Sequence, residues 1–424
     1  MGGIGKTTIS SWIARQPTVR ELFDRIIWIS LGQTPTMINL QSLTLQQLTG
    51  GVFTGDEPAE QRTQTLKQAM AGKKLLLVLD DVWDPDHEKL LNFVDEDSGA
   101  KVLLSSRVHQ VIETGGSKSD SAIVTIELPT EDDAVRMLLS TAGLPVDCDA
   151  PEEATELVRF CNLLPLSISI TGKLVQDFGI GLEAKEWDGI VSEMKEAFAE
   201  NDGARSVEES VIAASVNSIR GAQTQSVVHL FRCLALVPED TVVPLEILAM
   251  MCESVPEAGG GYTKRPSVLS TRRWLKQLID RSLVLGAVDC PALHDIVRDY
   301  VIAKLSPSEL QQSHRRLVDL LRAARPVDIT TEQRQWNNVG NTPSSRYVQE
   351  FCAEHIRLGW NTEWESDDHA CSWLSDFPHD DIVGKCCSKS TALSPTLVAR
   401  TQIRINSIVS NTSCEDSDLV VFTS

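Results

Sequence analysis

The sequence is short of positive charge: 39 Lys and Arg stand against 59 Asp and Glu, a formal net charge of −20 over 424 residues. A surface of this sign repels phosphate backbones and anionic lipids, which argues against nucleic acid and membranes as partners. No apolar run approaches the roughly 18 residues that a membrane span needs, and the glycine-rich start does not resemble a signal peptide. We therefore expect a cytoplasmic protein.

Cysteine pairing motifs are also missing. The ten cysteines are scattered, only Cys386 and Cys387 are adjacent, and no C-x-x-C pair occurs. This usage is typical of reduced thiols in the cytosol rather than of a disulfide framework. The length suggests about two to four domains.

One segment is dense in possible metal ligands. It contains Cys352, His355, His369, Cys371, His379, Cys386 and Cys387. Their spacing matches no regular zinc pattern, so we favour ordinary packed or surface residues over a structural metal site.

The most informative motif lies at the start of the chain, where residues 2–8 read Gly-Gly-Ile-Gly-Lys-Thr-Thr. Such a loop points backbone N–H groups into one concavity, and the helix after it adds a positive dipole end. Lys6 is expected to reach the β- and γ-phosphates of a nucleotide, and Thr7 to ligate Mg²⁺. The usual first glycine would precede Met1. Without it and the strand before it, we expect unpaired backbone groups in the neighbouring sheet.

Apolar runs follow the loop. Ile9, Trp12 and Ile13 have helical spacing, so the loop opens an amphipathic helix. Residues 26–29, 75–79 and 102–104 are continuous apolar runs, and 123–126 is a candidate for a fourth. Such runs, separated by helices, predict a parallel sheet covered on both faces, with ligands at the carboxyl ends of its strands.

Charged residues end two of these runs. Asp80 and Asp81 follow residues 75–79, and Arg107 follows the run at 102–104. A buried carboxylate at position 80 could hold Mg²⁺, while Asp81 could orient or deprotonate an attacking water. Arg107 could face a γ-phosphate. The alternative is that these residues merely end strands at the surface.

From about residue 131 the chain becomes helical. Apolar residues recur at helical spacing at 134–138, 157–161, 227–236, 245–251, 269–279 and 296–305. Residues 283–286 predict a small strand and turn, so the later helices resemble a winged-helix module. Beyond Pro326 periodicity fades, and no repeat of fixed period is found.

The order of these motifs resembles the NB-ARC family, the nucleotide switches of plant immune receptors and apoptotic ATPases. The matching segments are 1–8, 23–31, 75–83 (LLLVLDDVW), 101–107 (KVLLSSR), 164–166, 236–240 and 293–295. The resemblance covers about residues 1–305. It implies an α/β P-loop sheet without its first strand (1–130), a helical domain (131–203), a winged-helix domain (204–305) and a helical or irregular tail (306–424), which could begin a repeat array.

The resemblance also assigns roles to single residues. The phosphates would be cradled by Gly2, Gly3, Ile4, Gly5, Lys6, Thr7 and Thr8. Thr7 and Asp80 would serve Mg²⁺, with Lys6 and Asp81 in catalysis. Arg107 corresponds to a sensor of the γ-phosphate, Pro165 to a proline packed on the nucleotide base or sugar, and His294 to a histidine that reaches the ADP β-phosphate.

Two positions depart from the family pattern. Leu163 stands where the family carries glycine, and we expect it to crowd the base pocket. Leu293 replaces methionine, a volume-conserving change that should matter little.

The resemblance implies a molecular switch that uses ADP, ATP and Mg²⁺. ADP would hold the domains closed, ATP would open them for self-association or for signalling partners, and slow hydrolysis would reset the switch. A degenerate, nucleotide-free scaffold is the alternative. Two further classes are disfavoured: partitioning ATPases, whose loop has lysine where Met1 stands, and DNA binding through the mildly basic helix at 269–281.

Overall fold

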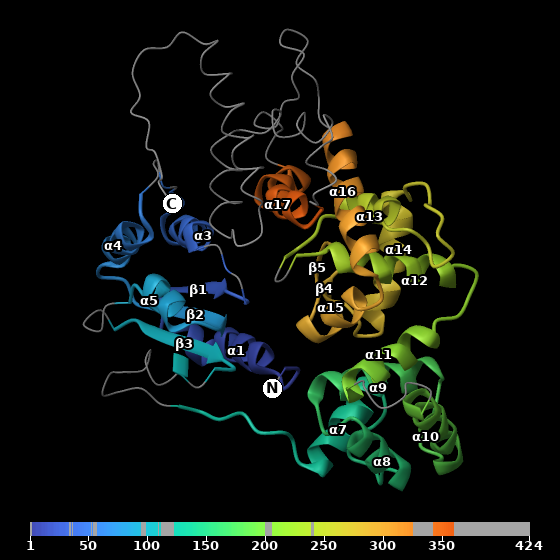
Figure 1. The fold of residues 1–424 in the computed structure, drawn as a ribbon. Helices are drawn as coiled ribbons and strands as arrows, with labels where there is room; N and C mark the ends of the chain where they lie inside the picture. Colours follow the sequence, from blue (N-terminus) through green and yellow to red (C-terminus); the bar gives the residue numbers. More distant parts are fainter. Residues whose placement is uncertain are drawn as a thin grey trace.

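The computed structural model describes residues 2–359 except 34, 36, 52, 54–56, 95–98, 109, 112–122, 200–205, 239–240 and 325–341. Figure 1 shows three groups of elements. The α/β lobe consists of α1 (Lys6–Arg15), α2 (Pro17–Arg20), β1 (Arg25–Ser30), α3 (Met37–Thr49), α4 (Ala59–Met70), β2 (Leu75–Val82), α5 (Pro85–Leu91) and β3 (Lys101–Ser106).

The other two groups are almost entirely helical. The helical lobe consists of α7 (Glu131–Ala142), α8 (Glu152–Phe160), α9 (Pro165–Asp177), α10 (Ala184–Ala199) and α11 (Val207–Asn217). The C-terminal lobe consists of α12 (Thr224–Cys233), η2 (Leu234–Leu236), α13 (Leu245–Ser254), α14 (Val268–Asp280), β4 (Leu285–Ala287), β5 (Cys290–Ala292), α15 (Asp295–Ile302), α16 (Pro307–Ala323) and α17 (Pro343–Gly359).

The sheet of the α/β lobe is parallel and has the order β1-β2-β3. β2 is the central strand, and residues 75–79 are buried, as expected for a strand covered on both faces. β2 pairs with β3 from Leu76 to Leu79 and with β1 on its other side, so no missing strand lies beside it. In the described sheet β3 is an edge strand, and the expectation of unpaired groups beside a missing strand stays a prediction for such an edge.

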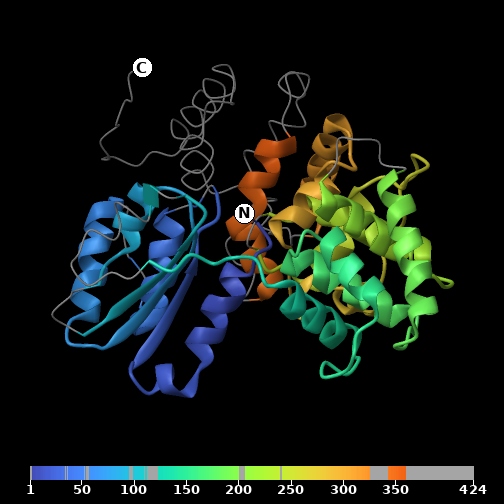
Figure 2. The ribbon, with the colours of Figure 1, turned by 90° about the horizontal axis from the view of Figure 1, so that it is seen from below.

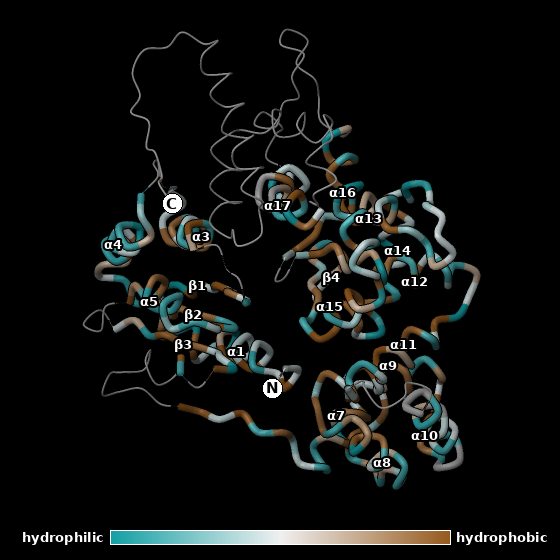
Figure 3. The backbone as a smooth tube through the Cα atoms, in the orientation of Figure 1, coloured by the Kyte–Doolittle hydropathy of each residue, from teal (hydrophilic) through white to brown (hydrophobic). Residues whose placement is uncertain are grey.

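Residues 123–126 do not form the fourth strand. They lie in the described stretch 123–130 that leads to α7, and this stretch begins with hydrophobic residues (Figure 3). Ile123 is 62% exposed and Val124 is 81% exposed. Their β-prone composition does not decide the outcome, because a strand also needs an edge to pair with.

Helix α1 is confirmed, but its apolar face is not the buried one. Trp12 is 64% exposed, whereas Ser10 and Ala14 are buried. α1 contacts β2 and β3, and the small side chains occupy its buried side. Tertiary contact, not the hydrophobic pattern, sets the orientation of this helix.

The molecule has two hydrophobic cores. One lies within the α/β lobe around β2, and the other runs continuously through the helical and C-terminal lobes. α11 links these two lobes, since it packs on α9 and α10 as well as on α15. The predicted strand and turn at 283–286 corresponds to the β4-β5 hairpin, shifted by a few residues. Within the described residues, no helix is long and apolar enough to cross a membrane.

A buried polar chain attaches α17 to α16. Nδ1 of His314 lies 2.9 Å from Nδ1 of His355, and the Tyr347 hydroxyl lies 2.8 Å from Nε2 of His355. α17 lies on the side of the C-terminal lobe that faces the α/β lobe (Figures 1 and 2). Cys352 and His355 belong to this helix; the other candidate metal ligands lie outside the described residues.

Burial makes this attachment sensitive to acid. It lowers the pKa of His355 to about 4, and burial and then the His355 charge lower the pKa of His314 well below its usual value. An unfolded histidine takes up a proton near pH 6.5, whereas these remain neutral in the folded state. Their contribution to stability is therefore complete above pH 6.5 and is lost as the pH falls toward 4.

We predict that the free energy of unfolding falls below pH 6.5 by about 1.4 kcal/mol per pH unit for each of these histidines. Urea titrations between pH 7.5 and 5 measure this slope. In the variant His355→Gln the free energy of unfolding should fall less steeply with pH, because unfolding takes up about one proton fewer. An unchanged slope would show that His355 is not held neutral.

Candidate functional site

The glycine loop touches the helical lobe directly. Gly3 has φ +71°, and a Cβ there would lie 3.1 Å from both Leu164 Cδ2 and Leu166 Cβ. The Leu166 N–H donates to the Gly3 carbonyl at 3.2 Å. Gly5, with φ +98°, is the N-cap of α1. At Gly3 the left-handed backbone and the close neighbours both favour glycine, whereas at Gly5, where no atom lies within 4 Å of a Cβ, the backbone conformation alone does so.

The same loop touches the C-terminal lobe. A Cβ on Gly2 would lie 3.0 Å from Nη1 of Arg107 and 3.2 Å from Cδ1 of Ile296, at the start of α15. Residues from all three lobes therefore meet at residues 2–3. The N-terminus of α1 follows immediately, where backbone N–H groups have no partner within the helix.

The two acids of β2 sit at an irregularity of the strand. The register with β3 shifts between Leu79 and Val82, and Asp81 has φ +54°. The Ser105 hydroxyl donates to Oδ1 of Asp80 at 2.6 Å and accepts the Asp81 N–H at 3.0 Å. At this irregularity one serine of β3 therefore binds both the Asp80 carboxylate and the Asp81 backbone N–H.

Asp80 is the buried acid of the pair, with an exposed fraction of 3%. Burial raises its pKa, while hydrogen bonds from Ser105 and Thr7 lower it, as does the charge of Lys6 to a smaller degree. A buried carboxylate beside a threonine hydroxyl is an oxygen-donor pair of the kind that Mg²⁺ prefers. Thr7 and Asp80 therefore fit the metal role predicted for them.

Asp81 is engaged by two donors. Nε1–H of Trp83 donates to Oδ2 at 2.9 Å, and Nε–H of Arg107 donates to Oδ1 at 3.2 Å. The guanidinium carbon of Arg107 lies 5.2 Å from the centre of the Trp83 ring, within cation–π range. Both carboxylate oxygens of Asp81 are thus occupied in this structure.

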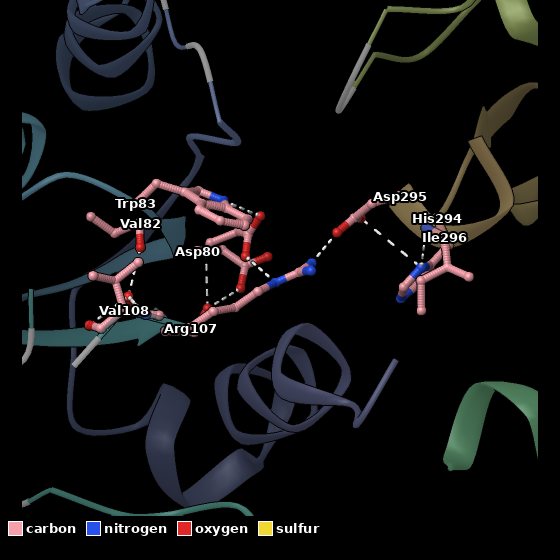
Figure 4. A network of polar contacts seen from close by, with 11 residues as sticks. Asp80, Val82, Trp83, Arg107, Val108, His294, Asp295 and Ile296 are labelled. Carbon is pink, nitrogen blue, oxygen red and sulfur yellow. Dashed lines mark hydrogen bonds and ion pairs between the residues drawn. The ribbon is translucent and has the colours of Figure 1, made fainter. Parts of the chain in front are cut away.

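Arg107 also crosses to the C-terminal lobe, where its Nη2 forms an ion pair with Asp295 (Figure 4). Burial lowers the pKa of Arg107, but the charges of Asp295 and Asp81 outweigh this and raise it above its usual value. Burial raises the pKa of Asp295, but the charges of His294 and Arg107 outweigh this effect and hold the pKa below its usual value. Both partners are charged at neutral pH.

His294 is the N-cap of α15. Its Nδ1 accepts the Ile296 N–H at 3.2 Å, which places the proton of the neutral ring on Nε2. Burial lowers its pKa; Asp295 opposes this, and the charges of Arg107 and Lys6 contribute to the lowering. His294 is therefore a neutral donor in the same electrostatic environment as Lys6.

Pro165 is the first residue of α9, and the leucines on either side of it contact Gly3. Leu163 has φ +55°, and it packs partly buried on the core of the helical lobe. This explains why glycine suits the position: the backbone is left-handed there, which costs a leucine about 1 kcal/mol. The crowding of a base pocket by Leu163 stays a prediction; the structure adds a backbone strain at this residue that the sequence did not indicate.

Most of the predicted residues converge on this site. The structure brings Gly2, Gly3, Lys6, Thr7, Asp80, Asp81, Arg107 and His294 into one network of contacts and charges. Thr8 is exposed on the first turn of α1, and Ile4 is half-buried. Three participants had been given no role: Trp83, Ser105 and Asp295. Each lies inside a segment that matches the family pattern, but position in the sequence alone does not show which side chains turn inward.

Three of the four basic residues on α14 or directly after it form ion pairs. Arg272, Lys276 and Arg281 each pair with an aspartate, at 2.7, 2.8 and 2.6 Å.

Comparison with known proteins confirms the predicted resemblance. Residues 1–145 match the family model of the NB-ARC domain. The chain is 28% identical over 322 residues to disease resistance RPP13-like protein 4 of Arabidopsis thaliana, covering 71% of this chain and 36% of the relative. It is 24% identical over 386 residues to apoptotic protease-activating factor 1 of Mus musculus, covering 85% and 28%.

A solved structure has a similar fold. A STAND protein (signal transduction ATPase with numerous domains) with a tetratricopeptide repeat sensor, from Pyrococcus horikoshii, matches with a TM-score of 0.50 at 12% identity. The match covers 96% of this chain and 53% of that one. The predicted fold class, a parallel sheet followed by helical domains, is confirmed. The chain spans about a third of the length of the curated relatives it matches.

We predict that Ser105→Ala lowers the free energy of unfolding by about 1–3 kcal/mol, because it leaves the Asp80 carboxylate and the Asp81 N–H without this partner in a buried place. Urea unfolding measures the change. Thr65→Ala is the control, since that exposed hydroxyl bonds only within α4. Equal effects of the two substitutions would contradict this reading of Ser105.

Proposed function

We propose that this chain is an ADP/ATP-binding molecular switch of the NB-ARC type. The observation that carries the proposal is the ion pair between Arg107 and Asp295, which joins the sheet of the α/β lobe to the start of α15 beside the glycine loop. A nucleotide bound at that loop would lie where three lobes meet. Its phosphates would then influence how the lobes pack.

The loop residues supply the phosphate site. Gly2 to Thr8 would present backbone N–H groups, and Lys6 would add a charge. Burial and then Arg107 lower the pKa of Lys6, and a bound phosphate would favour its charged form. His294 would donate from Nε2 to a diphosphate, and Pro165 would pack against the base or sugar.

Thr7 and Asp80 would hold Mg²⁺ with the nucleotide. The ion, when bound, neutralises part of the phosphate charge. Asp80 is already fixed by Ser105 at 2.6 Å, so this carboxylate needs little reorganisation to accept a cation.

Arg107 would make the site sensitive to the third phosphate. It pairs with Asp295 in the closed arrangement and cannot also turn fully to a terminal phosphate. A γ-phosphate near Asp295 would bring two negative charges together, which favours separation of the lobes. A diphosphate has no such conflict. The two nucleotides would therefore differ in affinity for the closed state, which any such switch requires.

Slow ATP hydrolysis would reset the switch, with Asp81 acting on the attacking water. In the closed arrangement both oxygens of Asp81 are engaged by Trp83 and Arg107. Hydrolysis would therefore follow opening.

The switch would control assembly with copies of itself or with signalling partners, in the cytoplasm. The names of the relatives, which concern disease resistance and apoptotic protease activation, support a signalling role. A nucleotide-free scaffold is the second candidate, and ADP binding separates the two.

We predict that the purified protein binds ADP with a measurable heat and that Lys6→Ala weakens this binding by about tenfold to a hundredfold, the value of a charge-assisted hydrogen bond. Isothermal titration calorimetry makes the measurement, with Lys67→Ala on α4 as a control of equal charge change. No heat with the unaltered protein, together with no thermal stabilisation by ADP, would favour the scaffold.

We also predict that Asp295→Asn favours triphosphate over diphosphate by about tenfold, because the closed arrangement loses its charge pair and the γ-phosphate loses a repulsive neighbour. The ratio of the dissociation constants for ADP and a non-hydrolysable ATP analogue reports this. Asp289→Asn is the matched control, since Asp289 pairs with Arg272 at 2.7 and 3.0 Å inside the C-terminal lobe. A similar shift in both variants would show a non-specific charge effect.

A further inference from the structure

Trp83 is the last residue of the LLLVLDDVW segment, directly after β2, and it is half-buried. Its indole N–H donates to Oδ2 of Asp81 at 2.9 Å, and its ring faces the Arg107 guanidinium at 5.2 Å. In Figure 4 it lies on the same side of the sheet end as Asp80 and Arg107.

The two oxygens of Asp81 have partners of different kinds. Oδ2 is bound by Trp83, which lies two residues away on the same strand end, so this contact does not depend on how the lobes pack. Oδ1 is bound by Arg107, which also reaches the C-terminal lobe. When Arg107 leaves, Oδ1 becomes available while Oδ2 stays anchored.

The contact from Trp83 matters for the position of the Asp81 carboxylate, because the Asp81 backbone is left-handed, with φ +54°. A carboxylate on such a backbone is held by its contacts rather than by the regular strand geometry. The Ser105 hydroxyl fixes the Asp81 N–H at 3.0 Å, and Trp83 and Arg107 bind the carboxylate itself.

We propose that Trp83 is a positioning residue for ATP hydrolysis, which holds Asp81 so that its free oxygen faces the attacking water once Arg107 has turned away. The inference rests on the proposed function. In the step, the water oxygen bonds to the γ-phosphorus and its proton passes to Oδ1 of Asp81. The bond from the γ-phosphorus to the β–γ bridging oxygen breaks, and its electron pair leaves with ADP, giving ADP and inorganic phosphate.

The test is Trp83→Phe in the full chain, which removes the N–H donor and keeps an aromatic ring for Arg107. We expect kcat for ATP hydrolysis to fall by about tenfold, the lower range for a hydrogen bond to a charged group. We expect KM and the dissociation constant for ADP to stay unchanged. If Trp83 had only a structural role, the substitution would change kcat and the dissociation constant for ADP together, or it would change neither.

Two controls sharpen the result. Trp28→Phe is matched, since Trp28 is half-buried on β1 of the same sheet and its N–H donates to Ser30 at 3.1 Å; it should leave kcat unchanged. Adding Trp83→Phe to Asp81→Asn should cause no further loss, because asparagine tolerates the left-handed backbone and has no base to position. An additive loss in that double variant would overturn the proposal.

A second measurement does not need turnover. ADP with aluminium fluoride imitates the transferring phosphoryl group, and Trp83→Phe should weaken its binding about tenfold relative to ADP alone. Equal weakening of both, or of neither, would overturn the role of Trp83. Absence of ADP binding by the unaltered protein is a different outcome, which refutes the proposed function and this inference with it.

Discussion

A single guanidinium shared between carboxylates of two lobes organises this molecule. Arg107 comes from the end of β3 and contacts Asp81 in its own lobe and Asp295 at the start of α15. A partly buried arginine without counter-charges would destabilise the fold. Pairing with Asp81 and Asp295 avoids this penalty and holds the two lobes that carry these residues together. The glycine loop lies in the same contact, since a Cβ at Gly2 would meet both Arg107 and Ile296. Phosphate chemistry and domain packing therefore depend on the same side chain.

The site also depends on an irregular strand. β2 is fully apolar up to Leu79, which buries it between its neighbours, and the register with β3 then shifts by the time Val82 pairs with Ser106. The left-handed Asp81 and the bridging Ser105 hold this irregularity. Bulges beside functional sites commonly re-aim a side chain in this way. Here the result is one buried carboxylate suited to a cation and one engaged carboxylate that Arg107 can release.

Much of the fold follows from local pattern. The run at 75–79 is too apolar for anything but a central strand, and the leucine-proline-leucine at 164–166 begins a helix because proline suits its first turn. The failures have a common cause. Residues 123–126 have strand composition but pair with no strand in the structure. Trp12 belongs to an apolar stripe, but α1 turns Ser10 and Ala14 inward. In both places a non-local partner, absent from the local pattern, decides the outcome.

The sequence by itself determined which chemical groups are present: a phosphate loop, a pair of acids after a buried strand, an arginine at a strand end and a histidine before a helix. Those follow from residue types and spacing, which are local properties. Only the tertiary structure decided that Arg107 pairs with Asp295, that Trp83 and Ser105 hold the acids, and that residues 2–3 touch all three lobes. Arg107 and Asp295 alone are 188 positions apart, and such contacts arise from how separately formed lobes pack, which no short stretch of sequence encodes.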